Sequence, residues 1–151
     1  MPYLVPRENI RINERNLPHW SQEGVTYFVT FRLADSIPYG KLRELMRERK
    51  TFLEHCPLPH NSDLSVRFHG LFSDKIDRWM DNGIGKCWLK NSRFSEIVAN
   101  ALNRFNSDRY ELGEWVIMPN HVHLTITPKL GFRLSKILHS WKSYSANKIN
   151  T

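Results

Sequence analysis

The chain has 151 residues, with 22 Lys and Arg against 15 Asp and Glu and a formal net charge of +7. This length predicts one domain. An apolar fraction of 40% excludes a disordered chain, because so much apolar surface can form a core. No apolar run approaches the roughly 18 residues that a membrane helix needs, and the N-terminus lacks the apolar stretch of a signal peptide. We therefore expect a soluble, cytoplasmic protein without membrane partners.

The positive charge is concentrated near the end of the chain. After Glu114 there is no acidic residue, whereas five basic residues follow: Lys129, Arg133, Lys136, Lys142 and Lys148. A surface of one sign attracts polyanions, and attraction to phosphates dominates affinity for nucleic acids. The charge predicts either a nucleic-acid partner or a surface that serves solubility alone.

The first half of the chain predicts one strand followed by two helices. Residues 26–33 are rich in β-branched and aromatic side chains and predict a strand with Phe28, Thr30 and Arg32 on one side. Residues 41–54 have the period of an amphipathic helix that ends ahead of Pro57. Residues 55–63 predict a loop. A second helix should follow and end at Gly83, with apolar positions at Phe72, Ile76, Trp79 and Met80.

The second half predicts a helix, a β-hairpin and a final helix. The helix covers about 93–105 with Ser92 as N-cap, and residues 110–118 and 122–127 predict strands joined by a turn at Pro119 and Asn120. The last helix begins near Leu134. Its apolar positions predict the buried face: Leu134, Ile137, Leu138, Trp141, Tyr144 and Ile149.

This order of elements predicts an α+β fold. The strands would form a small antiparallel sheet with helices packed on one face. The two charged helices, at about 39–90, would be an insertion after the first strand, within one domain that covers residues 1–151.

The second strand of the predicted hairpin contains a His-x-His pair. Side chains two residues apart on a strand point to the same face, so His121 and His123 should converge, whereas Val122, Leu124 and Ile126 should face the core. Two imidazoles on one face can bind a metal if a carboxylate, amide or third imidazole joins them. The alternative is two half-buried histidines satisfied by hydrogen bonds.

The cysteines predict no comparable site. Cys56 and Cys87 lack the C-x-x-C spacing of zinc or redox sites and are too few for a disulfide framework. Cys56 and His60 could form half of a metal site, but so sparse a pair is better interpreted as incidental.

Four segments of the sequence resemble those of a known family. They are YFVTFRLADSIP at 27–38, WMDNGIGKCWL at 79–89, MPNHVHL at 118–124 and LSKILHSWKSYSANKIN at 134–150. With these segments in this order, the chain resembles the HUH superfamily of single-tyrosine transposases, and more narrowly the REP-associated tyrosine transposases of the IS200-like family.

The resemblance implies a ferredoxin-like or RRM-like sheet and a DNA transposase that acts on single-stranded DNA with hairpins, such as REP-like elements. In that family a tyrosine hydroxyl attacks the scissile phosphate, giving a 5′-phosphotyrosine intermediate, and the two histidines of the motif bind a divalent metal. His121 and His123 would be the catalytic metal ligands here. Imidazole ligands alone favour zinc or iron, whereas the family implies Mg²⁺ or Mn²⁺. A homodimer is possible.

The chain departs from the family at the nucleophile. In the family the tyrosine lies on a further helix downstream of the histidines, and the only tyrosine after His123 is Tyr144. The helical spacing of Tyr144 from Ile137 and Trp141 favours a place in the core over a role as nucleophile. We therefore expect a C-terminally truncated member, whether as a gene fragment, an interrupted reading frame or an incomplete record. The alternative function is that of a catalytically inactive DNA-binding fragment of the same family.

Other residues invite a weaker functional interpretation. We predict DNA contacts for Arg32, Lys142 and Lys148, although an exposed arginine on a strand often has no such role. Trp141 at helical spacing should belong to the core. Asn120 should serve the hairpin turn. His139 could be a third metal ligand, but a structural or solvent role on the final helix is preferred.

Three functional hypotheses remain open. The first is a DNA transposase and nuclease of the resembled family, intact or degenerate. The second is a nucleic-acid-binding module without chemistry. The third is an unrelated zinc enzyme that uses His121 and His123.

Overall fold

The structure, a computed structural model, describes residues 11–13, 19–21, 24–58 and 60–151. Two compact units are distinguished. The sheet unit contains the described residues up to Phe31 together with Leu89–Met118 and Val122–Thr151. The helical unit contains the described residues of Arg32–Trp88 together with Pro119–His121. Each unit is described by itself below.

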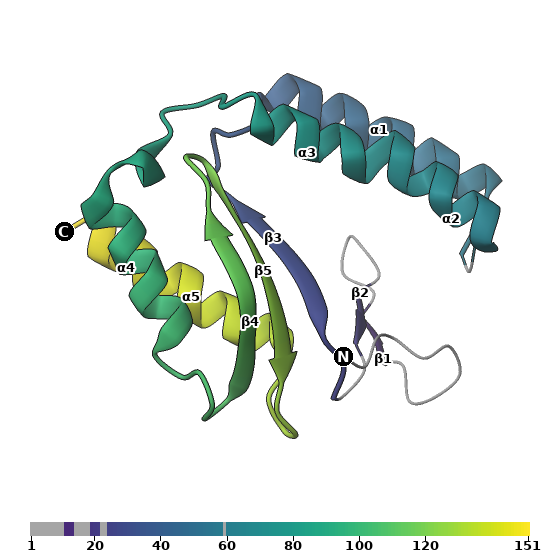
Figure 1. Cartoon of the computed structure of the whole chain (residues 1–151). Coiled ribbons are helices and arrows are strands. Elements are labelled where there is room, and N and C mark those ends of the chain that lie inside the picture. The colour runs from purple at the N-terminus through teal and green to yellow at the C-terminus, as the bar shows by residue number, and fades with distance from the viewer. Residues whose placement is uncertain (1–10, 14–18, 22–23, 59) are drawn as a thin grey trace. The chain divides into compact units, whose positions relative to one another are not determined.

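The helical unit is built on two long helical segments (Figure 1). Helix α1 covers Tyr39–His55, as its amphipathic pattern predicts, and ends before Pro57. The second segment runs through α2 (Ser62–Phe68), a π-helical turn (His69–Ser73) and α3 (Asp74–Asp81). It begins slightly earlier than predicted, because the Asn61 side chain accepts a hydrogen bond from Leu64 N at 2.9 Å and caps the helix.

The core of the helical unit is aromatic and aliphatic. The rings of Phe52, Phe68 and Phe72 pack against one another with centroids 5.0–5.7 Å apart. Leu45 and Met80 are almost fully buried. Burial of this kind holds α1 against the second helical segment and fixes the position of its C-terminal residue, Asp81.

The sheet unit contains a three-stranded antiparallel sheet in the order β3-β5-β4. Strand β3 covers Tyr27–Arg32, β4 covers Tyr110–Ile117 and β5 covers His121–Pro128. Both the predicted first strand and the predicted hairpin are confirmed. A separate two-stranded sheet joins β1 (Arg11–Asn13) and β2 (His19–Ser21), where the sequence analysis assigned no strand.

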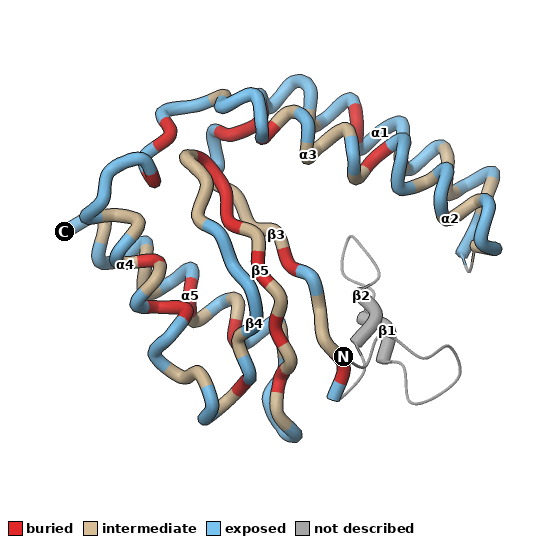
Figure 2. Tube along the Cα trace, viewed as in Figure 1, coloured by how far each residue is buried: buried red, intermediate tan, exposed pale blue. Residues whose placement is uncertain are grey.

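One face of β5 forms the core of the sheet unit. Val122, Leu124 and Ile126 are 0–1% exposed, which confirms the predicted alternation. Figure 2 shows the buried and half-buried residues alternating along β5. Helices α4 (Ser92–Asn103) and α5 (Leu134–Ile149) pack against each other, and α4 also contacts β4. They contribute further buried side chains: Val98, Ala101, Leu102, Ile137 and Trp141.

The register of β4 against β5 shifts between Leu112 and Trp115. A Cβ atom added to Gly113 would overlap Thr125 Oγ1, so any larger residue here would require the threonine side chain to move. After the shift Val116 lies opposite His123, and Ile117 lies opposite Val122. The register shift therefore determines which residues of β4 lie opposite His123 and Val122 of β5.

Two local predictions for the helices need correction. The N-cap of α4 is Asn91, not Ser92, because the Asn91 side chain accepts the hydrogen bond of Arg93 N at 3.0 Å. Of the six positions predicted to be buried on α5, only Ile137 and Trp141 are buried. Tyr144 is half-buried, with the Arg104 guanidinium 5.7 Å from its ring centre, so it is not a core residue.

The observed architecture is α+β, with a three-stranded antiparallel sheet and helices, as predicted. Within the described residues, no helix combines the length and the apolar character needed to cross a membrane. A single domain with an insertion at about 39–90 stays a prediction.

Candidate metal centre

The His-x-His pair lies at the beginning of strand β5. His121 is the first residue of the strand and His123 the third, so one strand directs both side chains to the same side. The intervening Val122 is fully buried on the opposite side. Burial of Val122 therefore fixes the register that presents the two imidazoles together.

Within the helical unit, His121 is buried between an amide and a carboxylate. Its side chain is 1% exposed. Nδ1 lies 2.7 Å from Asn120 Oδ1, and Nε2 lies 3.7 Å from Asp81 Oδ1. Both imidazole nitrogens therefore face oxygen atoms, and the Asp81 carboxylate, which is 62% exposed, keeps contact with solvent.

The Asn120 side chain is fully buried and uses its whole amide group. Nδ2 donates hydrogen bonds to the carbonyl oxygens of Met80 and Ile84, both at 3.0 Å. These two bonds connect the hairpin turn to Met80 and Ile84, which flank residues 81–83. Asn120 was predicted to serve the hairpin turn, and its side chain also links this turn to the end of α3 and to Ile84.

Asp81 is placed by the end of α3 and the turn that follows. It is the last residue of the helix. Gly83 adopts a φ of +66°, a left-handed conformation that favours glycine, and its N–H donates to Met80 O at 3.0 Å. The predicted helix stop at Gly83 is thus observed, and it leaves the Asp81 carboxylate beside His121.

The loop after β3 is hydrogen-bonded to the same turn. Leu33 N donates to Asn120 O at 2.9 Å, and Ser36, which is fully buried, donates through Oγ to Leu33 O at 2.9 Å. Arg32 Nη1 donates to Leu33 O at 3.1 Å and to Ala34 O at 3.3 Å. The Arg32 guanidinium therefore supports this loop, and its predicted contact with DNA stays a prediction.

His123 has a different environment, within the sheet unit. Its Nδ1 lies 2.8 Å from Thr30 Oγ1 on β3. Its ring stacks on Phe28, with centroids 5.5 Å apart and an interplanar angle of 19°. Phe28 is 69% exposed and His123 is half-buried. The predicted common face of Phe28 and Thr30 is observed, because both side chains contact the same histidine.

This set of donors fits a divalent metal. Asp81 and His121 each offer a ligand atom, and the two atoms lie close enough for one cation to contact both. His123 adds a second imidazole from the same strand as His121. Imidazole nitrogen suits Zn²⁺ and Fe²⁺, whereas a carboxylate oxygen also suits Mg²⁺ and Mn²⁺. The Nδ1 hydrogen bonds of both histidines are the outer contacts that usually orient metal-bound imidazoles.

The other candidate ligands do not join this group. His60 Nε2 bonds the backbone carbonyl of Cys56 at 2.8 Å, so its contact with Cys56 is through the backbone and not through sulfur. His139 is exposed on α5. Lys142 and Lys148 are also exposed on α5, and Lys142 Nζ lies 5.8 Å from the centre of the Phe31 ring.

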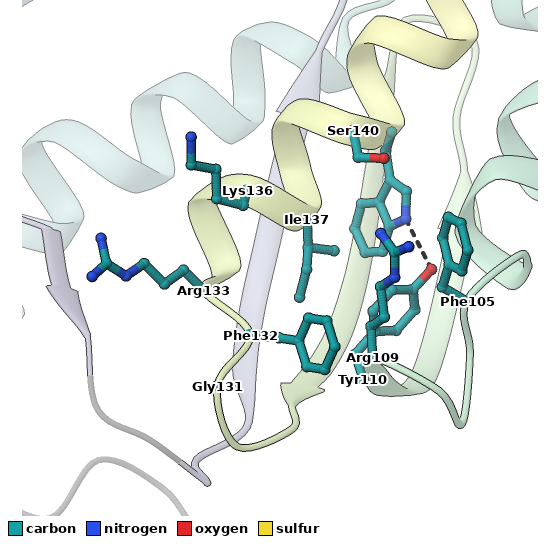
Figure 3. Close-up of a pocket in the computed structure, with 10 residues that line it drawn as sticks. Phe105, Arg109, Tyr110, Gly131, Phe132, Arg133, Lys136, Ile137 and Ser140 are labelled. Carbon is teal, nitrogen blue, oxygen red and sulfur yellow. Dashed lines mark hydrogen bonds between the residues drawn. The ribbon is translucent and has the colours of Figure 1, made fainter.

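A pocket of about 350 Å³ lies elsewhere in the sheet unit, among aromatic side chains (Figure 3). Trp141 Nε1 donates to Tyr110 Oη at 2.9 Å, and Tyr110 Oη donates to Leu102 O at 2.7 Å. Burial raises the pKa of Tyr110, although the bond from Trp141 acts in the opposite direction. The predicted core position of Trp141 is confirmed.

The lining of this pocket does not offer metal ligands. The Arg109 guanidinium lies 3.6 Å from the centre of the Phe105 ring, and Figure 3 shows Arg133 and Lys136 extending away from the aromatic cluster. The lining contains neither histidine nor carboxylate. Asp81 and His121, which face each other within the helical unit, are therefore the better candidate for a catalytic centre.

Residues 87–151 match the family model described as Transposase IS200 like. The matched segment is less than half of the chain, and it contains α4, β4, β5 and α5 together with His121 and His123. No curated protein and no solved structure matches the chain. The match supports the transposase family, whereas Asp81 lies outside the matched segment.

The sequence did not indicate Asp81 as a member of the site, nor the buried contacts of the Asn120 side chain. Asp81 is separated from His121 by some 40 residues, and periodicity does not indicate such a contact. The available signal was its place in the word WMDNGIGKCWL, which carried part of the resemblance. Asn120 was noticed, but burial of its side chain could not be inferred from its position at a turn.

Proposed function

We propose that the chain is a member of the REP-associated tyrosine transposases and acts on single-stranded DNA that folds into hairpins. The observation that carries the proposal is the contact of His121 with Asp81, whose Oδ1 lies 3.7 Å from His121 Nε2. His121 and His123 belong to the same strand, β5. The match of residues 87–151 to the IS200-like transposase model supports it independently.

His121 and His123 would hold the metal, as the family resemblance implies, with Mg²⁺ or Mn²⁺ as the ion. Within the helical unit, Asp81 would add a carboxylate oxygen beside His121. When bound, a divalent metal polarises the phosphoryl oxygens and stabilises the charge that develops during attack on phosphorus. The protein's own contribution is positional. One strand sets the spacing of the imidazoles, and Asn120 and Thr30 orient them through their Nδ1 atoms.

The basic residues after Glu114 supply attraction for the DNA backbone. Lys142 and Lys148 are exposed on α5, and no acidic residue follows Glu114 in the sequence. Contacts with phosphates give affinity and orientation without reading the sequence. This charge supports a polyanionic partner. A metal held by the histidines would interact with a phosphate of that partner.

The proposal is tested by the binding of a labelled single-stranded DNA hairpin with Mn²⁺ or with EDTA. Because a metal on the histidines would contact a phosphate, Mn²⁺ should tighten binding to the natural chain by roughly tenfold, equivalent to about 1.4 kcal/mol. The tightening should disappear in the double variant His121→Ala/His123→Ala. His139→Ala, which removes an exposed histidine of α5, is the matched control and should behave as the natural chain.

Two outcomes would contradict the proposal. If the natural chain binds the hairpin no better than a duplex of the same length, the assigned DNA substrate is wrong. If Mn²⁺ tightens binding equally in the double variant, the histidines do not hold the metal that acts on DNA.

The covalent step is a separate question. We propose that Tyr144 is not the nucleophile, because in the family that the chain resembles the nucleophilic tyrosine lies on a further helix, downstream of the segment LSKILHSWKSYSANKIN that contains Tyr144 here. With Mn²⁺ and a labelled hairpin, this chain should give no protein–DNA adduct that depends on Tyr144. An adduct abolished by Tyr144→Phe, with hairpin binding retained, would make Tyr144 the nucleophile.

A further inference from the structure

The Asn120 amide is held in one orientation by two backbone carbonyls. Nδ2 donates to Met80 O and to Ile84 O, both at 3.0 Å. Rotating the amide by half a turn would place Oδ1 against these two acceptors and would lose both bonds. Because Asn120 is fully buried, water could not compensate for that loss. Oδ1 must therefore be the atom that faces His121.

That orientation determines which nitrogen of His121 carries the proton. Oδ1 can only accept a hydrogen bond, and it lies 2.7 Å from His121 Nδ1. In the neutral imidazole the proton then stays on Nδ1, and the lone pair that a metal requires is on Nε2. Nε2 is also the atom that faces Asp81, at 3.7 Å.

The hydroxyl that contacts the second histidine is a different kind of partner. His123 Nδ1 lies 2.8 Å from Thr30 Oγ1, and a hydroxyl can either donate or accept. The Thr30 hydroxyl by itself therefore does not select a tautomer of His123. The comparison makes Asn120 the more specific of the two contacts.

We propose that Asn120 is a positioning residue of the metal centre, which keeps His121 in the tautomer with the proton on Nδ1 and its Nε2 directed at the metal. The proposal rests on the proposed function, because it assigns to Asn120 a role in the metal site formed there. It goes further by predicting that the tautomer is set by the folded protein before any metal binds.

The tautomer can be read directly in the metal-free protein. Long-range proton–nitrogen NMR spectra of the full chain with labelled histidines distinguish the two nitrogens of each ring, and the His121→Gln variant identifies the signals of His121. The expected result is His121 with its proton on Nδ1. A proton on Nε2 with none on Nδ1 in the natural chain would overturn the proposal, whatever the protein's affinity for metal.

Two substitutions separate positioning from a merely structural role. Asn120→Asp keeps an acceptor facing His121 but lacks the donors to Met80 and Ile84, whereas Asn120→Leu lacks both. We expect Asn120→Asp to keep the Nδ1 tautomer and to bind Mn²⁺ within a few-fold of the natural chain. We expect Asn120→Leu to release the tautomer and to bind Mn²⁺ about 10 to 100 times more weakly, as for other outer contacts of metal ligands.

If Asn120 only anchored the turn, both variants would lose Mn²⁺ affinity to the same extent and the tautomer would not differ between them. That result would overturn the proposal. If Asn120→Leu fails to fold, the spectrum of the natural chain and the Mn²⁺ affinity of Asn120→Asp still decide. Loss of Mn²⁺ binding in His121→Ala/His123→Ala tests the proposed function separately, because it does not depend on the tautomer.

Discussion

The two faces of strand β5 differ in what they contribute. On one face Val122, Leu124 and Ile126 are almost completely excluded from solvent. On the other, His121 and His123 are paired with polar groups, Asn120 and Thr30. The strand alternates between them residue by residue, so the same register that forms the core also positions the histidines.

The comparison teaches that stability and chemistry are separable here although they share a backbone. Substitutions on the apolar face should lower the free energy of unfolding and affect metal binding only through loss of the fold. Substitution of the half-buried His123 should weaken metal binding and change stability little. The predictions below test that separation.

The largest expected effect on stability is that of Leu124→Ala. Leu124 is 1% exposed at the centre of the apolar face, and removal of its side-chain atoms should lower the free energy of unfolding by about 2–5 kcal/mol. Urea denaturation measures this change. The matched control is Leu130→Ala, because Leu130 is 80% exposed. Equal losses in the two variants would contradict the assigned core.

Next is Tyr110→Phe, at the end of β4 on the side of the apolar face. The tyrosine hydroxyl accepts from Trp141 Nε1 and donates to Leu102 O. Its removal leaves a buried donor and a buried acceptor unsatisfied, which should cost about 1–3 kcal/mol. Thermal or urea unfolding measures the loss. A variant as stable as the natural chain would show that these bonds contribute nothing net.

The same tyrosine predicts a dependence on alkaline pH. Burial raises the pKa of Tyr110 above its ordinary value near 10, so the folded protein favours the neutral phenol. The neutral Tyr110 phenol contributes fully to the free energy of unfolding below about pH 10, and this contribution falls as the pH rises through the pKa of Tyr110 in the folded protein. The loss of unfolding free energy between pH 9 and pH 11.5 should therefore be steeper for the natural chain than for Tyr110→Phe. Parallel curves would contradict the direction of the shift.

The smallest expected effect on stability is that of His123→Ala. His123 is half-buried, and its partner Thr30 can turn to water when the imidazole is gone. The cost should be below about 1 kcal/mol. Urea denaturation of the metal-free protein checks it. A loss as large as that of Leu124→Ala would mean that the histidine face belongs to the core after all.

Much of the fold could be predicted from local pattern. The alternation at Val122, Leu124 and Ile126 fixed β5, and the helical periodicity of residues 41–54 fixed α1, because a buried face leaves its period in the sequence. Helix ends were less certain. Asn91 and Ser92 are both good N-caps, and the residue one position earlier in the chain was the one that accepted the hydrogen bond.

The site could be predicted only in part. The two histidines were evident from strand geometry, but the contact of Asp81 with His121 depends on how a distant helix ends at Gly83. Asn120 was assigned to a turn because turns favour asparagine. Its three side-chain hydrogen bonds depend on tertiary structure. For Asn120 burial was not predicted, whereas for Tyr144 too much burial was predicted. The helical spacing of Tyr144 indicated a core position, but its side chain is half-buried.

The central claim is that the histidine face of β5 binds a divalent metal. Isothermal titration of the metal-free protein with Mn²⁺ tests it most directly. We predict one Mn²⁺ per chain for the natural protein and for His139→Ala. For His121→Ala/His123→Ala we predict a loss of affinity greater than the roughly 100-fold that outer contacts can cause. Unchanged Mn²⁺ binding by a folded double variant would contradict the claim.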